Sequence, residues 1–354
     1  MPVPYRAPVF DYIEVKKICF HAIYCTQRES NRDWQVDVSK HQHSYLSENS
    51  KQKSDGYNYV HLNWDIWSAL NGVRPSTVIT TGYYPTQLIA FLWAKLHGAK
   101  HIVMTDGWLG SEAHLGLVHR LVRKFVYRFT HAFVGASNGS LALFSSYGVS
   151  ADKQFKSLLP VVAQSKVSLT PIESREVDIL FVGRLEEPKN ARLFLQICNE
   201  ANVLLGRSLS VKVVGQGSLA TELAEYATIH NVKVEFTSFV PPEQIHEVYK
   251  AAKLLLLPTK VEAWGLVIAE AMSQSVVPII SDKTAAAGEL VINGENGLVL
   301  PVFDVTVWAS NVAKLLNNQM KLKSFSLKAK KSAAQYTVDA AAIGLLEAII
   351  YANK

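Results

Sequence analysis

Two glutamates, Glu262 and Glu270, flank the predicted start of a short helix near Trp264–Gly265. Glu262 lies just before this helix and Glu270 two turns inside it, roughly 12 Å further on at 1.5 Å per residue. Carboxylates that far apart cannot share one proton or one metal ion. They could bind two parts of one extended polar ligand, with an anionic group held between them by the free amides of the first helical turn. A sugar–diphosphate–ribose has this layout.

The spacing of the two glutamates is not distinctive by itself, because Glu235 and Glu243 repeat it. The context is more informative: an apolar strand predicted over Lys253–Leu257 is closed by Pro258 and followed by a glutamate, an aromatic residue, a glycine and a helix. A fully apolar strand is typical of a parallel sheet covered on both faces. The alternative is that both glutamates merely favour a helix, one of them near the positive end of its dipole.

Strands that alternate with helices of 10–15 residues run through both halves of the chain, which predicts βαβ units and parallel sheets. In the first half the predicted strands are Lys17–Tyr24, Thr77–Thr81, His101–Thr105 and Ala132–Ser137. In the second half they are Asp178–Val182, Ser210–Val214, Val232–Phe236, Lys253–Leu257, Val276–Ser281 and Leu298–Leu300. Ligands bind at the carboxyl ends of such strands. Asp106 stands at one of these ends, where the alternative is a turn residue facing solvent.

The length of 354 residues fits two domains. The expected divisions are an N-terminal Rossmann-like domain over 1–160, a polar linker over 161–177, a C-terminal Rossmann-like domain over 178–336, and a C-terminal helix over 337–354 that could pack back on the first domain. Two doubly wound halves make a cleft between the domains the expected ligand site.

The strand ends of the second half should bring glycines and cations together. Gly183 and Arg184 follow one strand, Lys189 opens the next helix, and Gly215 and Gly217 follow another strand. A cleft with closely approaching glycines, two cations and a helix N-terminus would suit a diphosphate. The pair Gly215-x-Gly217 alone is a weak dinucleotide signal, because no third glycine follows at the required spacing.

The net positive charge of the chain comes entirely from its first half. Residues 1–160 carry the whole net charge of +6, and the rest of the chain is neutral. A helix predicted over Leu115–Thr130 has an apolar face made of Val118, Leu121, Val122, Phe125, Val126 and Phe129. Its other face carries Arg120, Arg123, Lys124 and Arg128. The apolar face is expected to be core, and the basic face either meets anionic lipid headgroups or is simply solvated.

Composition narrows the classes of protein further. No apolar run approaches the 18–20 residues of a membrane span, and the first residues lack the apolar core of a secretory signal. Cys19, Cys25 and Cys198 lack metal-ligand spacing and suggest reduced thiols in a cytoplasmic protein. No Asp-x-Asp occurs, so a divalent metal has no obvious ligands and none is expected.

Four motifs follow one another in the second half: FVGRLEEPKN (181–190), VVGQGS (213–218), LLPTKVEAWGLVIAEAMS (256–273) and ELVINGENGLVLP (289–301). They resemble the C-terminal half of retaining glycosyltransferase family 4, which has the GT-B fold and uses nucleotide-sugar donors. The resemblance implies an α/β protein with two Rossmann-like doubly wound domains facing across a cleft, followed by C-terminal helices. Two departures are the missing Gly-rich loop after the first strand, within Gln27–Trp34, and Ser238 where members often have glycine.

The resemblance also implies roles for single residues. Arg184 and Lys189 match the basic pair that neutralises the donor diphosphate, Glu262 the carboxylate at the donor sugar, and Glu270 the carboxylate that binds the ribose. The remaining donor-binding positions are Gly183, Gly215, Gly217, Trp264, Gly265 and Leu266. On the acceptor side, Asp106 is the catalytic candidate by position, and Arg32 with Trp34 looks like the start of some polysaccharide-assembly members.

Together these observations predict a metal-independent, retaining glycosyltransferase of the hexosyltransferase type, with no cofactor beyond its nucleotide-sugar substrate. The acceptor would be a hydroxyl of a glycan or lipid-linked glycan in surface polysaccharide synthesis. The expected location is the cytoplasm, peripheral on the inner face of a membrane. The rivals are a sugar-nucleotide epimerase of the same fold and a catalytically silent nucleotide-sugar-binding or membrane-docking protein. A nucleic-acid partner is not expected, because no aromatic-interleaved basic motif accompanies the charge. The nucleotide base, the sugar, the linkage and the oligomeric state stay open.

Overall fold

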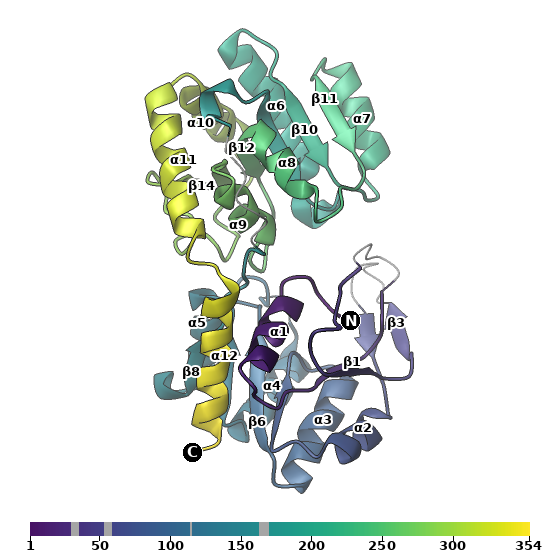
Figure 1. Cartoon of the computed structure of the whole chain (residues 1–354). Coiled ribbons are helices and arrows are strands. Elements are labelled where there is room, and N and C mark those ends of the chain that lie inside the picture. Colours follow the sequence, from purple (N-terminus) through teal and green to yellow (C-terminus); the bar gives the residue numbers. More distant parts are fainter. Residues whose placement is uncertain (30–34, 53–58, 114, 163–169) are drawn as a thin grey trace. The chain divides into compact units, whose positions relative to one another are not determined.

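The structure is a computed structural model that describes residues 1–29, 35–52, 59–113, 115–162 and 170–354. The chain forms two compact units (Figure 1). The N-terminal unit comprises Met1–Val162 and Thr337–Lys354, and the C-terminal unit comprises Ala163–Tyr336.

The C-terminal unit is built on a six-stranded parallel sheet in the order β11-β10-β9-β12-β13-β14. Its strands are β9 (Val177–Val182), β10 (Val211–Val214), β11 (Val234–Thr237), β12 (Ala252–Leu257), β13 (Val277–Ser281) and β14 (Leu298–Leu300). The central strands β9 and β12 are almost completely buried, as expected for parallel strands covered on both faces. The six strands predicted from the sequence are therefore confirmed.

Helices connect these strands and cover the sheet (Figure 1). They are α6 (Ala191–Leu205), α7 (Ala220–Ile229), α8 (Ile245–Ala251), α9 (Leu266–Ser273), α10 (Val305–Leu316) and α11 (Gln319–Ala333). A 3-10 turn, Glu187–Lys189, precedes α6. Gly206 ends α6 in the left-handed conformation, at a φ of 62°, which glycine adopts without strain.

The N-terminal unit contains a four-stranded parallel sheet in the order β5-β6-β7-β8. These strands are β5 (Thr77–Thr80), β6 (Lys100–Thr105), β7 (Ala132–Gly135) and β8 (Gln154–Lys156). A parallel pair, β1 (Ala22–Tyr24) with β2 (His43–Tyr45), and an antiparallel pair, β3 (Ser50–Gln52) with β4 (Tyr59–His61), accompany it. Its helices are α1 (Ala7–Val15), α2 (Ile66–Val73), α3 (Pro85–Leu96), α4 (Leu117–Arg128), α5 (Asn138–Ser146) and α12 (Val338–Ala352).

The last helix, α12, packs with α1 in the core of the N-terminal unit (Figure 1). Gly344 allows a close crossing, since a Cβ there would lie 1.9 Å from the carbonyl oxygen of Lys156. The Ser157 hydroxyl donates to the carbonyl of Ala341 at 2.7 Å and fixes the same crossing. The chain therefore ends in the unit in which it begins.

The C-terminal stretch Gln319–Ala352 is long and apolar enough to cross a membrane by length and composition alone. It contains no uninterrupted apolar run of 18–20 residues, since Asp339 and Glu347 interrupt its most apolar part. In the structure the stretch consists of two 15-residue helices, α11 and α12, which pack in different units. Buried core helices pass the same test of length and composition.

The first sixty residues differ most from expectation. The strand predicted over Lys17–Tyr24 is reduced to β1, and the preceding helix α1 was not predicted at all. Val9 and Ile13 of α1 are fully buried against α12. Their packing partner lies at the other end of the chain, so no local pattern could reveal it.

Candidate functional site

The loops that follow β9 and β12 lie side by side, because these strands are neighbours in the sheet. The amide of Lys260 donates to the carbonyl of Pro188 at 2.9 Å. The side-chain amide of Asn190 donates to the carbonyl of Pro258 at 3.0 Å. Two stretches singled out from the sequence, 183–190 and 258–265, are thereby joined at the carboxyl end of the sheet, where ligands bind in such folds.

An ion pair between Lys189 and Glu262 connects the two loops. Both side chains are largely buried, at 22% and 15% exposure, so water screens the pair only partly. The resemblance assigned these residues to different parts of a ligand, and the structure brings them into direct contact. An anion that binds Lys189 must therefore compete with Glu262 or share the lysine with it.

The backbone of Glu262 is held from a third loop, which follows β13. Its amide donates to the carbonyl of Lys283 at 3.0 Å, and its carbonyl accepts from the amide of Ala285 at 3.3 Å. These bonds fix the glutamate directly ahead of α9. The carboxylate is thus positioned by the backbone as well as by Lys189.

Gly265 caps α9 with a φ of 85°, in the left-handed region that favours glycine. A Cβ at this position would lie 2.7 Å from Ile268 Cδ1 and 3.3 Å from Glu262 Cγ. Only glycine can therefore start the helix this close to Glu262. The first amides of a helix lack intrahelical partners, and Leu266 is the first residue of α9, so the geometry suits an anion.

Glu270, inside α9, accepts a hydrogen bond from the Tyr249 hydroxyl of α8 at 2.8 Å. Burial raises the pKa of the Glu270 carboxyl above its ordinary value, although the tyrosine hydrogen bond opposes this shift. Burial also raises the pKa of Tyr249, so this phenol stays protonated and donates. Tyr249 orients Glu270, and no sequence motif pointed to it.

Gly215 and Gly217 permit the close packing of two strand-end loops, whereas a Cβ on Gly183 would meet only the side chains of Phe181 and Lys189, at 3.7 Å or more. A Cβ on Gly215 would lie 1.8 Å from the carbonyl oxygen of Gly183, and one on Gly217 would lie 2.4 Å from that of Leu185. Gly215 and Gly217 therefore admit the protein's own backbone, and the donor-binding role of the three glycines remains a prediction. Glu186 strengthens the packing by accepting hydrogen bonds from the Ser218 amide and hydroxyl at 3.0 and 2.5 Å.

Trp264 does not present its ring to a ligand. The indole is 1% exposed and packs against Tyr336 with ring centroids 5.5 Å apart. Burial of this large apolar ring stabilises the polar turn that lies over it. Trp264 can thus contribute to a donor site only through its backbone. Arg184 lies half-buried at the carboxyl end of β9, directly after Gly183.

Asp106 follows β6 in the N-terminal unit and forms a salt bridge with Arg6 at 3.0 Å. The buried Arg6 also donates to the Ser157 hydroxyl at 3.0 Å. Asp106 keeps 34% of its side chain exposed, so the salt bridge does not seal it from solvent. Its catalytic role remains a prediction. Arg32 and Trp34 lie outside the described residues.

Helix α4 is rotated about its own axis relative to the orientation expected from the sequence. Arg123, predicted on the exposed basic face, is buried and forms an ion pair with Glu112. Four residues assigned to the apolar core face are exposed: Val118, Leu121, Phe125 and Phe129. The other three predicted cations, Arg120, Lys124 and Arg128, are exposed as expected.

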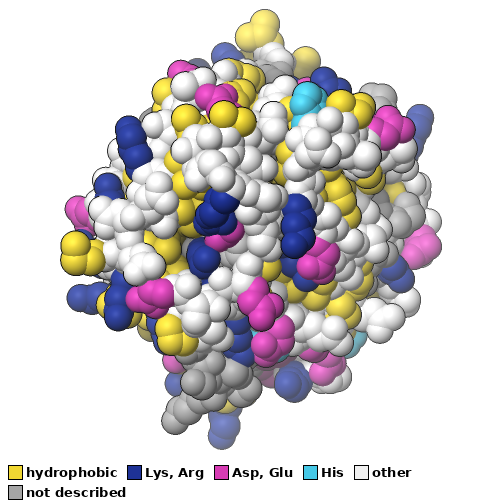
Figure 2. Space-filling model, turned by 90° about the horizontal axis from the view of Figure 1, so that it is seen from above, with side chains coloured by type: hydrophobic (Ala, Val, Ile, Leu, Met, Phe, Trp, Pro, Cys, Tyr) yellow, Lys and Arg dark blue, Asp and Glu magenta, His cyan; other side chains and the backbone are white. Residues whose placement is uncertain are grey.

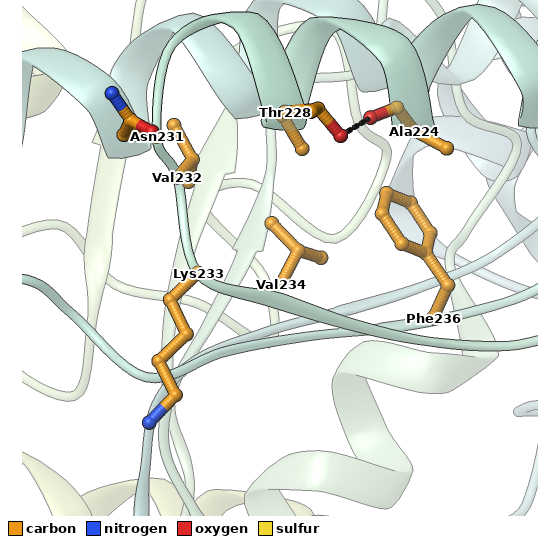
Figure 3. A pocket seen from close by; sticks show the side chains of 8 residues that line it. Ala224, Thr228, Asn231, Val232, Lys233, Val234 and Phe236 are labelled. Atoms are coloured by element: carbon orange, nitrogen blue, oxygen red, sulfur yellow. Dashed lines mark hydrogen bonds between the residues drawn. The ribbon is translucent and has the colours of Figure 1, made fainter.

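Two further surfaces lie outside the loops described above. A shallow groove of about 440 Å³ runs between α7 and the start of β11, and its lining mixes Ala, Val and Phe side chains with Thr228, Asn231 and Lys233 (Figure 3). It lies at the amino end of the parallel sheet. On the face displayed in Figure 2, Lys and Arg alternate with Asp and Glu. Among the described residues, no three His, Cys, Asp or Glu side chains are grouped so as to hold a metal ion.

Comparison with known proteins identifies the domain that carries the candidate site. Residues 167–332 match the family model described as Glycosyl transferases group 1. The C-terminal unit is a domain of this family. The chain is 31% identical over 196 residues to a D-inositol 3-phosphate glycosyltransferase of Rhodococcus jostii, an alignment that covers 52% of this chain and 42% of the relative. The chain spans less than half the length of the inositol-phosphate relatives it matches.

A longer alignment joins the chain to a Campylobacter jejuni enzyme named as an N-acetylgalactosaminyltransferase acting on a diphospho-undecaprenol-linked glycan. The identity is 24%, over 72% of this chain and 70% of the relative. Among solved structures, Anabaena Alr3699/HepE in complex with UDP matches with a TM-score of 0.76 at 15% identity, covering 99% and 97% of the two chains. A sucrose-phosphate synthase from Thermosynechococcus elongatus matches with a TM-score of 0.71 at 14% identity, covering 98% and 92%. The group 1 domain thus belongs to a chain with the GT-B fold, as predicted.

Proposed function

We propose that the protein is a glycosyltransferase that moves a sugar from a nucleoside-diphosphate sugar to a hydroxyl of a glycan or lipid-linked glycan. The observation that carries the proposal is the Lys189–Glu262 ion pair beside the N-terminus of α9, within a group 1 glycosyltransferase domain. The Campylobacter relative, named for a lipid-linked acceptor, supports the acceptor class.

In this proposal the bond between the sugar carbon and the diphosphate oxygen breaks, the acceptor hydroxyl oxygen bonds to that carbon, and the hydroxyl proton passes to the departing diphosphate, on which negative charge develops during the transfer. Arg184, Lys189 and the first amides of α9 stabilise this charge, and Glu262 lies beside the lysine that does so. Glu270, held by Tyr249, binds the ribose hydroxyls. Fixed cations and helix amides supply this stabilisation without a metal, so we propose metal-independent transfer. Retention of anomeric configuration is proposed from the resemblance to a retaining family alone.

The proposed setting is the cytoplasm, in surface polysaccharide synthesis.

Thermal-shift measurements with UDP, GDP, ADP and dTDP identify the donor nucleotide, since a ligand at a hundred times its Kd stabilises the folded state by about 2.7 kcal/mol. UDP is the first nucleotide to test, because the Anabaena protein was solved with it. We expect one of the four to raise the melting temperature clearly, and the absence of any shift would contradict a donor site.

Turnover assays then separate the activities. With the selected donor and a mixed set of lipid-linked glycans, sugar transfer should persist in excess EDTA and yield a product with the donor's anomeric configuration. Loss of transfer in EDTA with rescue by manganese or magnesium would overturn metal independence. Conversion of the donor alone to an epimer would instead identify a sugar-nucleotide epimerase.

A further inference from the structure

Helix α4 exposes an unusual amount of apolar surface. Leu117, Val118, Leu121, Phe125 and Phe129 are 76%, 72%, 66%, 55% and 42% exposed. Single exposed apolar side chains are common in soluble proteins, whereas contiguous apolar patches mark surfaces that meet another molecule. Five such side chains along one short helix form a patch of this second kind.

The patch is a continuous row. Leu117, Leu121, Phe125 and Phe129 are spaced four residues apart and therefore follow one another along the same side of the helix. The rings of Phe125 and Phe129 contact each other, with centroids 5.3 Å apart. We call the surface formed by these four residues and Val118 the apolar row.

Cations form a second row directly beside the first. Arg120, Lys124 and Arg128 are also four residues apart, each precedes a residue of the apolar row in the chain, and all three are exposed. No Asp or Glu occurs between Glu112 and Asp152. The exposed side of α4 thus combines apolar and positively charged surface with no acidic residue of its own.

The orientation of α4 is fixed from inside the unit. Arg123 pairs with Glu112, and its guanidinium lies 4.7 Å from the centre of the Tyr83 ring. The Tyr83 hydroxyl donates to that of the buried Tyr127 at 2.8 Å. Rolling the helix to bury the apolar row would break these contacts and expose Val126, which is 2% exposed. The apolar row therefore remains on the surface.

We propose that α4 docks the protein on an anionic lipid bilayer, with the apolar row inserted at the boundary between headgroups and acyl chains and the three cations bound to headgroups. A helix with apolar and basic surface side by side lies in the plane of the interface. The 12-residue α4 is only about 18 Å long at 1.5 Å per residue, too short to cross a hydrocarbon core of about 30 Å. The sequence suggested contact through the basic face alone, and the structure adds the apolar row. The inference does not depend on transfer activity.

Sedimentation of the full-length protein with vesicles tests the proposal. Wild type should pellet with phosphatidylcholine–phosphatidylglycerol vesicles at low salt and far less with pure phosphatidylcholine. The variant Leu121→Ser/Phe125→Ser should lose binding to both. Changing Arg120, Lys124 and Arg128 together to Ser should weaken binding to anionic vesicles roughly a hundredfold, at about 1 kcal/mol per cation.

Matched controls remove the same kinds of side chain elsewhere. Val203→Ser/Ile229→Ser removes two exposed apolar side chains of the C-terminal unit, and Lys328, Lys330 and Lys331 changed to Ser remove three exposed cations of α11. Both should bind like wild type, and circular dichroism should show all variants folded. Absence of wild-type binding at low salt would overturn the proposal. Vesicle binding that survives Leu121→Ser/Phe125→Ser would also overturn it. The same holds if the apolar row is found to mediate self-association of the protein instead.

Discussion

The two units place their charged side chains in opposite ways. In the C-terminal unit, Lys189 and Glu262 join loops at the carboxyl end of the sheet, where a ligand can reach them. In the N-terminal unit, Arg123 is buried beneath α4 while apolar side chains of the same helix face solvent. Residue type and spacing thus indicate where a strand-end loop lies. Which side of a helix is buried depends instead on partners that are distant in the sequence.

The largest expected effect concerns the loop packing of the C-terminal unit. Gly215→Ala would place a Cβ 1.8 Å from the Gly183 carbonyl oxygen, and we expect it to lower the free energy of unfolding by about 3 kcal/mol through overpacking and strain. Urea denaturation measures this. Gly72→Ala in α2 is the control from the N-terminal unit, because its Cβ meets nothing within 4 Å and should stabilise by about 0.5–1 kcal/mol. Equal effects of the two changes would contradict the packing account.

The buried ion pair of the N-terminal unit gives the next largest effect. Arg123→Met leaves Glu112 without its cation at 15% side-chain exposure and should cost about 3 kcal/mol of unfolding free energy. The comparison pair in the C-terminal unit is Lys260–Glu187, whose side chains are 35% and 70% exposed. Lys260→Ala should cost no more than about 1 kcal/mol, the usual upper range for an exposed pair. If Arg123→Met were as mild, Arg123 could not be what fixes the roll of α4.

The sequence predicted the C-terminal unit well for a physical reason. Buried parallel strands such as β12 are continuous apolar runs closed by glycine or proline, so they are visible without knowledge of their neighbours. The position of Glu262, between such a strand and Gly265, followed from the same local pattern. Its contact with Lys189 did not, because 73 residues separate the two in the chain.

The N-terminal unit was predicted less well because its decisive contacts are distant in sequence. Arg6 bonds Ser157 across 151 residues, and α1 packs on α12 at the far end of the chain. The roll of α4 depends on Tyr83 and Glu112, both outside the helix. A helical pattern of apolar residues indicates which of them share a side, but not that this side is the buried one.

Tyr249→Phe tests whether the Tyr249 hydroxyl orients Glu270 in the candidate site, and its expected effect is smaller. The change removes the hydrogen bond to Glu270 and should weaken nucleoside-diphosphate binding by about 1–2 kcal/mol, while leaving pyrophosphate binding unchanged. Isothermal titration calorimetry of both ligands separates this positioning role from a general loss of structure, which would weaken both.

Glu270→Gln tests the raised pKa of Glu270. Because folding raises the pKa of this carboxyl, its favourable contribution is present below the ordinary glutamate range and is lost as pH rises through the folded-state value. The unfolding free energy of wild type relative to Glu270→Gln should therefore fall as pH rises from acid toward neutral. A difference that grows with pH would show that Glu270 is stabilised as a carboxylate instead.

Calorimetric titration with the nucleoside diphosphate selected by thermal shift tests the central claim, a donor site at the carboxyl end of the C-terminal sheet. Arg184→Ala and Lys189→Ala should each weaken binding by about 1.5–3 kcal/mol, the usual worth of a charge-assisted contact. Lys189→Ala should be the more severe, because it removes the cation that offsets the negative charge of Glu262 beside the ligand, and adding Glu262→Gln should restore part of the loss. Lys233→Ala, in the groove of Figure 3, is the control and should bind like wild type. Unchanged affinity in both Arg184→Ala and Lys189→Ala would contradict the account.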